Sequence, residues 1–310
     1  MRAGTLKTMP AAAGLGVPAS VVRDRALLVA AFGAVYVIWG STYLAIAWAV
    51  ATIPPLTMIA ARCLVAGGVL YAVSRARAGR PSAVEWRRAL VAGVLLFVTG
   101  QAMLAWGETR VASGPAALLI ASEPMFVALL GWGLKRSGAP TRAVWLALAV
   151  GFVGVAVMMA PGRLGGVDAV GALVIVVAAL SWSLGMFFAT PARDGSPVQT
   201  AAMQLIGGGA ALVVVAAATG DLGSLDPGGV SGRSLASFLY LVVFGSLITY
   251  SAYIWLLRRV GPGRLSSHGY VNPMVAVAFG AMLAGESITP AVVLASLLIL
   301  SSVVVLVRRG

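Results

Sequence analysis

The chain has 310 residues, of which 60% are hydrophobic and only 10% are charged, and its mean hydropathy is +0.98. Soluble proteins carry about 25% charged residues, so this composition excludes a water-soluble globule, a disordered chain, a coiled coil and a secreted disulfide scaffold. The net charge of +13 comes mostly from arginines between apolar segments, without the aromatic-interleaved basic patches of nucleic-acid-binding proteins, and it indicates a polytopic membrane protein.

Ten apolar segments are long enough to cross a bilayer, which takes about 20 residues of helix. In chain order they fall near residues 26–48, 54–74, 89–107, 115–134, 142–160, 169–189, 198–218, 235–257, 264–284 and 288–307. We therefore predict an all-α integral membrane protein with ten transmembrane helices, preceded by a cytoplasmic tail at residues 1–25. The tail ends in Arg23, Asp24 and Arg25, directly before a segment too long for the core of a signal peptide, so we expect no cleavage.

Lysines and arginines are distributed unevenly between the two sides that this alternation defines. Of the 22, 18 fall on the side of both termini, three fall on the other side, and Arg62 lies within a segment. Cytoplasmic loops are enriched in these residues. We therefore expect both termini in the cytoplasm and the protein in the plasma (inner) membrane.

The second half of the chain repeats the first. A shift of 149 residues aligns positions 101–134 with 250–283 without a gap, and eight positions are identical, among them the Pro-Met pairs at Pro124 and Pro273. Each copy holds five segments, an odd number, so the second copy enters the membrane from the opposite side. Inverted repeats of this kind occur in secondary transporters, with the substrate site at the repeat interface near the bilayer midplane. The two copies are residues 26–160 and 169–307.

Ionisable residues inside a membrane are costly and indicate function. Glu123 and Asn272 occupy the same repeat position, and each precedes a proline, which removes a backbone hydrogen bond one turn earlier. They are our candidates for a central site that contacts solute or proton. The alternative is that Pro124 and Pro273 only kink their helices. Arg62 would either hold a substrate carboxylate in its planar guanidinium or neutralise Glu123.

His268, the only histidine, lies one turn before Asn272. We favour a packed, hydrogen-bonded histidine over a proton relay in coupling. Aromatic side chains at helical spacing would line an apolar or aromatic-ligand cavity, with ordinary helix packing as the alternative. These aromatic candidates are Trp39, Tyr43, Trp182, Tyr253 and Tyr270.

Several sites are missing from the sequence. Cys63 is the only cysteine, and one histidine with one cysteine gives no metal-ligand pattern. No P-loop motif is present, so we expect neither a cofactor nor a metal. A proton on Glu123 is then the simplest means of coupling. The expected partners are the lipid bilayer, a small-molecule substrate and protons, with no nucleic acid, for a protein that acts as a monomer.

Three stretches carry a specific resemblance. They are Ile38-Trp39-Gly40-Ser41-Thr42-Tyr43, Ser181-Trp182-Ser183-Leu184-Gly185, and Ser267-His268-Gly269-Tyr270-Val271-Asn272-Pro273-Met274 followed by Gly285-Glu286. They resemble the drug/metabolite transporter superfamily, specifically proteins with two EamA repeats, and are most similar to the YedA-type inner-membrane exporters. The resemblance covers about residues 26–306. It implies ten helices around a central cavity lined mainly by spans 1, 3, 4, 6, 8 and 9, and the export of amino acids, other metabolites or drugs. It supplies no coupling carboxylate.

We predict a secondary transporter, not an enzyme, that exports small metabolites by alternating access of the two repeats. One alternative is an intramembrane hydrolase in which Ser266 or Ser267 acts with His268. Against it, adjacent side chains on a helix point apart, and no nucleophile elbow is present. The other alternative is a transport-incompetent membrane scaffold, which would tolerate changes at Glu123 and Asn272.

Overall fold

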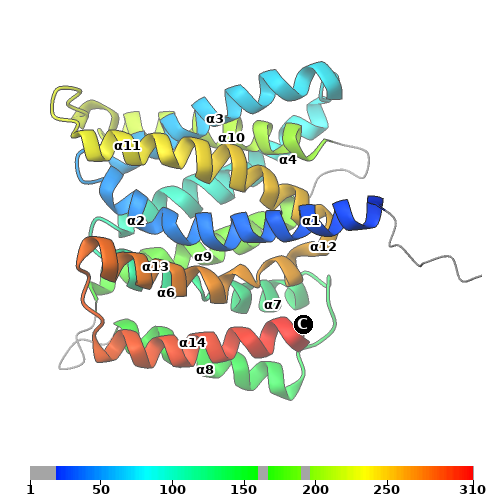
Figure 1. The fold of residues 1–310 in the computed structure, drawn as a ribbon, viewed down its shortest axis with the longest axis vertical. Coiled ribbons are helices and arrows are strands. Elements are labelled where there is room, and N and C mark those ends of the chain that lie inside the picture. The colour runs from blue at the N-terminus through cyan, green and yellow to red at the C-terminus, as the bar shows by residue number, and fades with distance from the viewer. Residues whose placement is uncertain (1–18, 160–166, 190–195, 310) are drawn as a thin grey trace, which may run out of the picture.

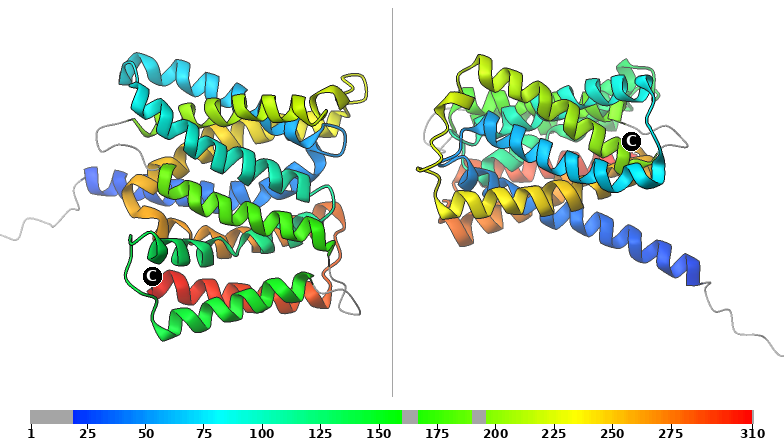
Figure 2. Two further views of the ribbon diagram at one scale, coloured as in Figure 1. Left: turned by 180° about the vertical axis from the view of Figure 1, so that it is seen from behind. Right: turned by 90° about the horizontal axis from the view of Figure 1, so that it is seen from above.

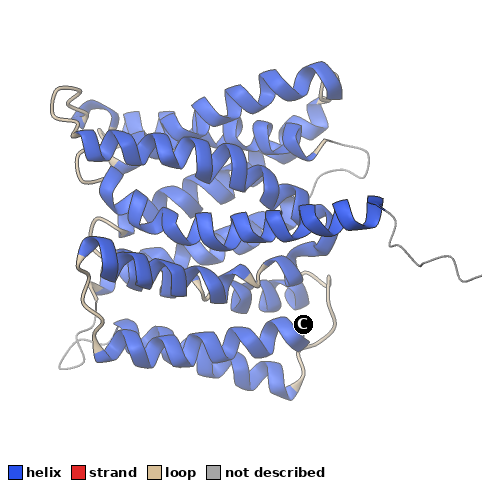
Figure 3. Cartoon of the chain, viewed as in Figure 1, coloured by secondary structure: helices blue, strands red, loops and turns tan. Residues whose placement is uncertain are grey.

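The fold is known from a computed structural model, which describes residues 19–159, 167–189 and 196–309 (Figure 1). Within these ranges all regular secondary structure is helical (Figure 3). The first half contains α1 (Ala19–Gly33), the π-helix η1 (Ala34–Ile38), α2 (Trp39–Ala49), α3 (Pro55–Ala78), α4 (Ala83–Gly93), the π-helix η2 (Val94–Ala102), α5 (Met103–Gly107), α6 (Ser113–Ile120), α7 (Glu123–Gly133) and α8 (Arg142–Met159). The second half contains α9 (Ala169–Ala189), α10 (Pro197–Ala218), the 3₁₀-helix η3 (Leu222–Ser224), α11 (Gly232–Tyr240), the π-helix η4 (Leu241–Tyr250), α12 (Ser251–Leu265), α13 (His268–Ala284) and α14 (Pro290–Arg309).

The prediction of a helical, multi-pass membrane protein is confirmed. Among the described residues, seven helical rods are long and apolar enough to cross a membrane, and three shorter apolar helices accompany them. The seven are Asp24–Ala49, Pro55–Ala78, Ala83–Gly107, Ser113–Gly133, Ala169–Ala189, Pro197–Ala218 and Gly232–Leu265, and the three are Arg142–Val157, Val271–Ala284 and Pro290–Leu306.

Polar and apolar side chains are placed as expected for a protein surrounded by lipid. Large apolar side chains lie on the surface, with Val214 69% exposed and Met282 81% exposed. The charged or polar Arg62, Glu123 and Asn272 are buried. A surface this apolar would aggregate in water, whereas in a bilayer it contacts acyl chains.

The helices form a layered bundle. α8 packs against α14 at one edge of the molecule, α3 packs against α10 near the opposite edge, and α2, α6, α9 and α13 lie between them (Figures 1 and 2). α1 begins and α14 ends at the same end of the bundle (Figure 1). We call this the terminal end and the other the distal end.

Glycines let the rods approach closely. A Cβ atom on Gly93 of α4 would collide with the carbonyl oxygen of Gln204 and lie 2.8 Å from the backbone nitrogen of Gly208, both in α10. A Cβ atom on Gly67 of α3 would lie 2.9 Å from the Leu205 side chain. Helix association in lipid depends on such close packing of small residues, so these two glycines allow α3 and α4 to lie close to α10.

Two rods are interrupted, one near the centre of the molecule and one toward the terminal end. α6 ends at Ile120 and α7 begins at Glu123, with a tight turn in which Ser122 N donates to Leu119 O at 3.1 Å. Pro124, which has no N–H to donate, follows directly and stands in the first turn of α7.

The second interruption precedes α13. The non-helical Gly261 (φ 74°) separates Pro262 to Leu265, formally the end of α12, from the rest of that helix. A tight turn in which Ser267 N donates to Arg264 O at 3.3 Å then leads to His268, the first residue of α13. Pro273 lies within α13 and does not end a helix. The two prolines thus stand in different settings, one at a break and one inside a helix.

Candidate functional site

A small cavity of about 40 Å³ lies where the α6–α7 break meets α2, η2, α9 and α13. Six of the residues that the sequence singled out line it: Trp39, Tyr43, Glu123, Trp182, His268 and Asn272. Gln101 and Thr42 add further polar groups to the wall. The fold therefore brings residues from both halves of the chain into one central site.

The centre of the site is a carboxyl–imidazole pair. Glu123 Oε1 lies 3.6 Å from His268 Nε2, and the two side chains are 2% and 4% exposed. Neither atom has a hydrogen-bond partner among the described residues. A buried polar atom without a partner costs free energy, so this pair is suited to share a proton, or to bind a water molecule or a polar solute group that lies beside both atoms.

Asn272 lies next to the second ring nitrogen of His268, on the side away from Glu123. With its amide nitrogen turned toward η1, it donates to the carbonyl oxygens of Val35 at 3.1 Å and Tyr36 at 2.9 Å. The other end of the amide lies 3.5 Å from His268 Nδ1. The orientation follows from the hydrogen-bond pattern. Asn272 therefore ties α13 to the first span and orients the imidazole, while Glu123 lies on the opposite side of the ring.

Aromatic rings from three rods enclose the pair. The Trp39 ring lies 4.8 Å from Tyr253, 5.7 Å from Trp182 and 5.7 Å from His268, measured between centroids. Both indoles are held by hydrogen bonds, since Trp39 Nε1 donates to Gly245 O at 3.1 Å and Trp182 Nε1 donates to Tyr253 Oη at 3.2 Å. Tyr253 contacts these two indoles, which line the cavity, but does not itself line it. The side chain of Tyr270, another predicted site residue, lies outside the described residues.

Arg62 does not contact Glu123 through any described interaction. Its Nε donates to Ser246 Oγ at 2.7 Å, and its Nη1 donates to Gln101 Oε1 at 3.2 Å. Gln101 lines the cavity, so the arginine is connected to the cavity wall through this amide. The sequence analysis did not select Gln101, although a glutamine inside an apolar segment is a polar residue that could have been predicted to face a cavity. The surrounding π-helix η2 is also typical of functional sites.

The predicted alternative of a serine–histidine dyad is not favoured by the contacts. Ser266 Oγ donates to Gly263 O at 2.8 Å, and Ser267 Oγ shares a hydrogen bond of 2.7 Å with Tyr36 Oη. The two imidazole nitrogens of His268 point toward Glu123 and Asn272 instead. Neither serine is placed for activation by the histidine.

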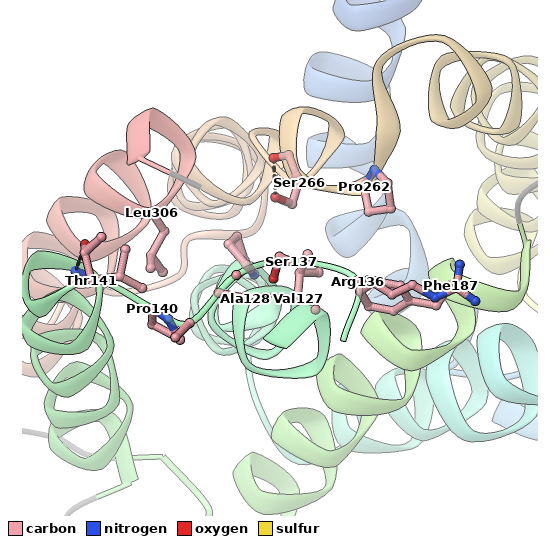
Figure 4. A pocket seen from close by; sticks show the side chains of 16 residues that line it. Val127, Ala128, Arg136, Ser137, Pro140, Thr141, Phe187, Pro262, Ser266 and Leu306 are labelled. Atoms are coloured by element: carbon pink, nitrogen blue, oxygen red, sulfur yellow. Dashed lines mark hydrogen bonds between the residues drawn. The ribbon is translucent and has the colours of Figure 1, made fainter. Parts of the chain in front are cut away.

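A second, larger cavity of about 540 Å³ opens at the terminal end. Figure 4 shows Val127, Ala128 and Ser137 on one side, and Pro262 and Ser266 on a different segment. Pro124 lines this cavity, whereas its neighbour Glu123 lines the small one. The first turn of α7 therefore separates the open cavity from the central site.

Comparison with known proteins assigns the family. Residues 26–160 and 169–308 each match the EamA-like transporter family. The inner membrane transporter YedA of Escherichia coli (strain K12) is 33% identical over 86% of each chain. The transporter YvbV of Bacillus subtilis (strain 168) is 24% identical over 91% of each chain.

The fold has a solved counterpart. A crystal structure of a protein with 17% sequence identity superposes with a TM-score of 0.64 and covers 92% of this chain and 99% of that chain. At this identity the likeness concerns the fold alone. The two family matches and the relationship to YedA carry the assignment: this chain belongs to the EamA-like transporter family, within the drug/metabolite transporter superfamily, and is a YedA-like membrane protein.

Proposed function

We propose that the protein is a secondary transporter that exports a small metabolite across the inner membrane by alternating access. The observation that carries the proposal is the pair of cavities on either side of the Glu123–Pro124 turn, a small one at the centre and a larger one at the terminal end. In such a mechanism a solute moves from an open cavity to a central site, and the two repeats then rock about it.

The proposed topology has ten spans in two inverted sets of five, with both termini in the cytoplasm. Its support is the shared end of α1 and α14 (Figure 1) and the two separate family matches. The basic residues add to this support. The connections at the terminal end carry most of the described lysines and arginines, including those at 75–88 and 135–142, as the positive-inside rule expects. The terminal end is then cytoplasmic, and the open cavity faces the cell interior.

The sizes of the two cavities support one assignment within the proposed transport cycle. A buried water molecule needs roughly 10–15 Å³ of cavity volume, so a cavity of about 40 Å³ holds about three water molecules. Pockets for small molecules run from roughly 300 to 1,000 Å³, a range that includes the 540 Å³ of the open cavity. We infer that solute waits in the open cavity, and that α7 and the aromatic rings must move apart to admit it.

The residues of the central site have distinct roles in this proposal. Glu123 takes up the coupling proton, with His268 as its hydrogen-bonding neighbour. Arg62 sets the position of Gln101 and, through it, the polar wall. Trp39, Tyr43, Trp182 and Tyr253 give the cavity its apolar shape, as their ring contacts and lining positions suggest.

The test is export itself. Medium from cells that overexpress the protein is compared with medium from cells that lack it, and each metabolite that accumulates outside is then tested with purified monomeric protein in proteoliposomes. Saturable flux of at least one such solute supports a transporter. Absence of flux for all of them, with protein that is folded and correctly inserted, would favour the membrane scaffold.

A further inference from the structure

Glu286 joins the two halves of the chain at the distal end. It follows α13, and its Oε1 accepts hydrogen bonds from Ser113 N at 2.9 Å and Ser113 Oγ at 2.6 Å. Its Oε2 accepts from Gly114 N at 3.0 Å. Ser113 and Gly114 are the first residues of α6, so the carboxylate satisfies backbone N–H groups that the helix itself leaves unpaired. A carboxylate at a helix N-terminus is also favoured by the helix dipole.

Glycine makes this contact possible. A Cβ atom on Gly280 would lie 2.5 Å from Glu286 Oε2 and 3.1 Å from Ser113 Oγ. A Cβ atom on Gly114 would lie 3.3 Å from the same carboxylate oxygen. The four residues Ser113, Gly114, Gly280 and Glu286 therefore form one closely packed contact between α6 and the end of α13, which we call the distal latch.

The repeat places four equivalent residues at the other end of the molecule. The same shift of 149 residues that aligns the two halves relates every member of the distal latch to a residue of the other copy. The four pairs are Ser113 with Pro262, Gly114 with Gly263, Gly280 with Gly131, and Glu286 with Ser137. All four equivalents line the open cavity of about 540 Å³ at the terminal end. Figure 4 shows Ser137 and Pro262 on separate segments of its wall.

The chemistry at the terminal end cannot reproduce the latch. Ser137 has no carboxylate to span the gap, and Pro262 has neither an N–H nor a hydroxyl to offer. Where the distal end holds a charged acceptor against three donors, the terminal end holds a cavity. The contact at the distal end and the cavity at the terminal end therefore coincide with two residue differences, Ser113 against Pro262 and Glu286 against Ser137, between otherwise equivalent positions.

We propose that the contact of Glu286 with the first turn of α6 is a one-sided gate latch, which holds the distal end closed and makes the state open at the terminal end the resting state. This inference rests on the proposed alternating-access function. An inverted repeat with identical ends would give the two open states equal free energies, and a contact made in only one of them shifts the population toward it. Charge-assisted hydrogen bonds are the strong ones among such contacts.

A second carboxylate at the same end provides a matched control. Asp221 Oδ1 accepts hydrogen bonds from Thr57 N at 2.8 Å and Thr57 Oγ1 at 2.7 Å, near the start of α3. Unlike α6 and α13, the α3–α10 pair is also held at the terminal end, where Gln199 Nε2 donates to Gly79 O at 2.9 Å. Loss of the Asp221 contact should therefore loosen the pair without opening a gate.

The experiment measures the opening of each end in the purified full-length protein. Spin labels are attached to cysteine pairs in a Cys63→Ala background, in lipid nanodiscs without added solute, and distances are measured by pulsed electron paramagnetic resonance. One pair, at the exposed Ala112 and Ser287, reports on the distal end, and the other, at the exposed Ala139 and Arg264, reports on the terminal end.

Glu286→Gln is the first variant, because the amide nitrogen would face a backbone N–H. We expect the long-distance population of the distal pair to rise several-fold, with a matching rise of the short-distance population at the terminal pair. Asp221→Asn should lower the melting temperature and leave both distance distributions unchanged. Unchanged distributions in Glu286→Gln, or the same shift in Asp221→Asn, would overturn the latch.

A reciprocal variant keeps the test decisive if Glu286→Gln does not fold. Ser137→Glu combined with Pro262→Ser would supply the missing carboxylate and N–H at the terminal end, and should shorten the terminal pair. If it leaves the terminal distances as in wild type, the inference fails. Neither measurement needs a substrate. A protein that shows the expected distance changes but no flux would refute the proposed function and would still support the latch.

Discussion

Glu123 and Asn272 are equivalent positions of the internal repeat, yet they meet only through the ring of His268. Glu123 lies 3.6 Å from Nε2 of the imidazole, and the Asn272 amide lies 3.5 Å from Nδ1. One side chain keeps an unsatisfied oxygen toward the cavity, while the other uses its nitrogen to hold the carbonyls of η1. The repeat thus contains one group with an oxygen that has no described hydrogen-bond partner and one group that holds its surroundings in place.

Glu123→Gln tests the proton role. The amide cannot take up and release a proton, so we expect the flux driven by a pH gradient in proteoliposomes to fall at least tenfold while the protein remains folded. Glu85→Gln is the control, because Glu85 is an exposed residue that caps α4 through Ser82. Wild-type rates in Glu123→Gln would refute proton coupling at this residue.

Asn272→Ala should destabilise the protein by about 1–3 kcal/mol, because it removes a buried amide that donates to two carbonyl oxygens of η1. The measurement is thermal or denaturant unfolding in detergent, beside Glu123→Gln. If Asn272→Ala unfolds at the wild-type temperature and loses only transport, then Asn272 contacts the solute and does not serve mainly to join α13 to the first span.

Alanine variants at two glycines distinguish the effect of close helix packing on stability from the effect of helix propensity. Gly93→Ala would drive a methyl group into the backbone of α10, near Gln204 and Gly208; we expect a loss of about 1–3 kcal/mol, as for overpacked cores. At Gly68 in α3, an added Cβ meets no atom within 4 Å. Alanine there should stabilise the helix by about 0.5–1 kcal/mol. Equal unfolding temperatures for the two variants would contradict the packing seen here.

Glu108 makes stability depend on pH. It follows the span Ala83–Gly107, is 7% exposed, and has no partner for either carboxylate oxygen among the described residues. Burial, and then the neighbouring charge of Glu286, raise the pKa of Glu108 well above 4.5. The folded state therefore binds more protons than the unfolded state above pH 4.5, and stability falls as pH rises from there through the raised pKa.

Glu108→Gln removes this titration, so the decline in melting temperature between about pH 5 and pH 8 should become shallower than in wild type. Melting curves across this range in one detergent provide the comparison, with Glu85→Gln as the exposed carboxylate control. An identical slope in Glu108→Gln and wild type would mean that Glu108 is not held in its protonated form by its surroundings.

The amino-acid sequence by itself determined the fold class, the apolar segments, the family and most of the residues around the central cavity. These properties follow from local rules, since helix length, apolar composition and the cost of a buried charge act on each segment independently. Glu123, His268 and Trp39 stood out because each is a polar or aromatic residue at a marked position in an apolar segment.

Only the tertiary structure decided which of these residues touch. It separated Arg62 from Glu123, gave Gln101 a place in the cavity wall, and turned Asn272 toward η1. It also set Glu286 against α6 and left Ser137 beside an open cavity. Such contacts depend on the rotation of each helix about its axis and on the gaps left by glycines, which arise from packing between segments far apart in the sequence.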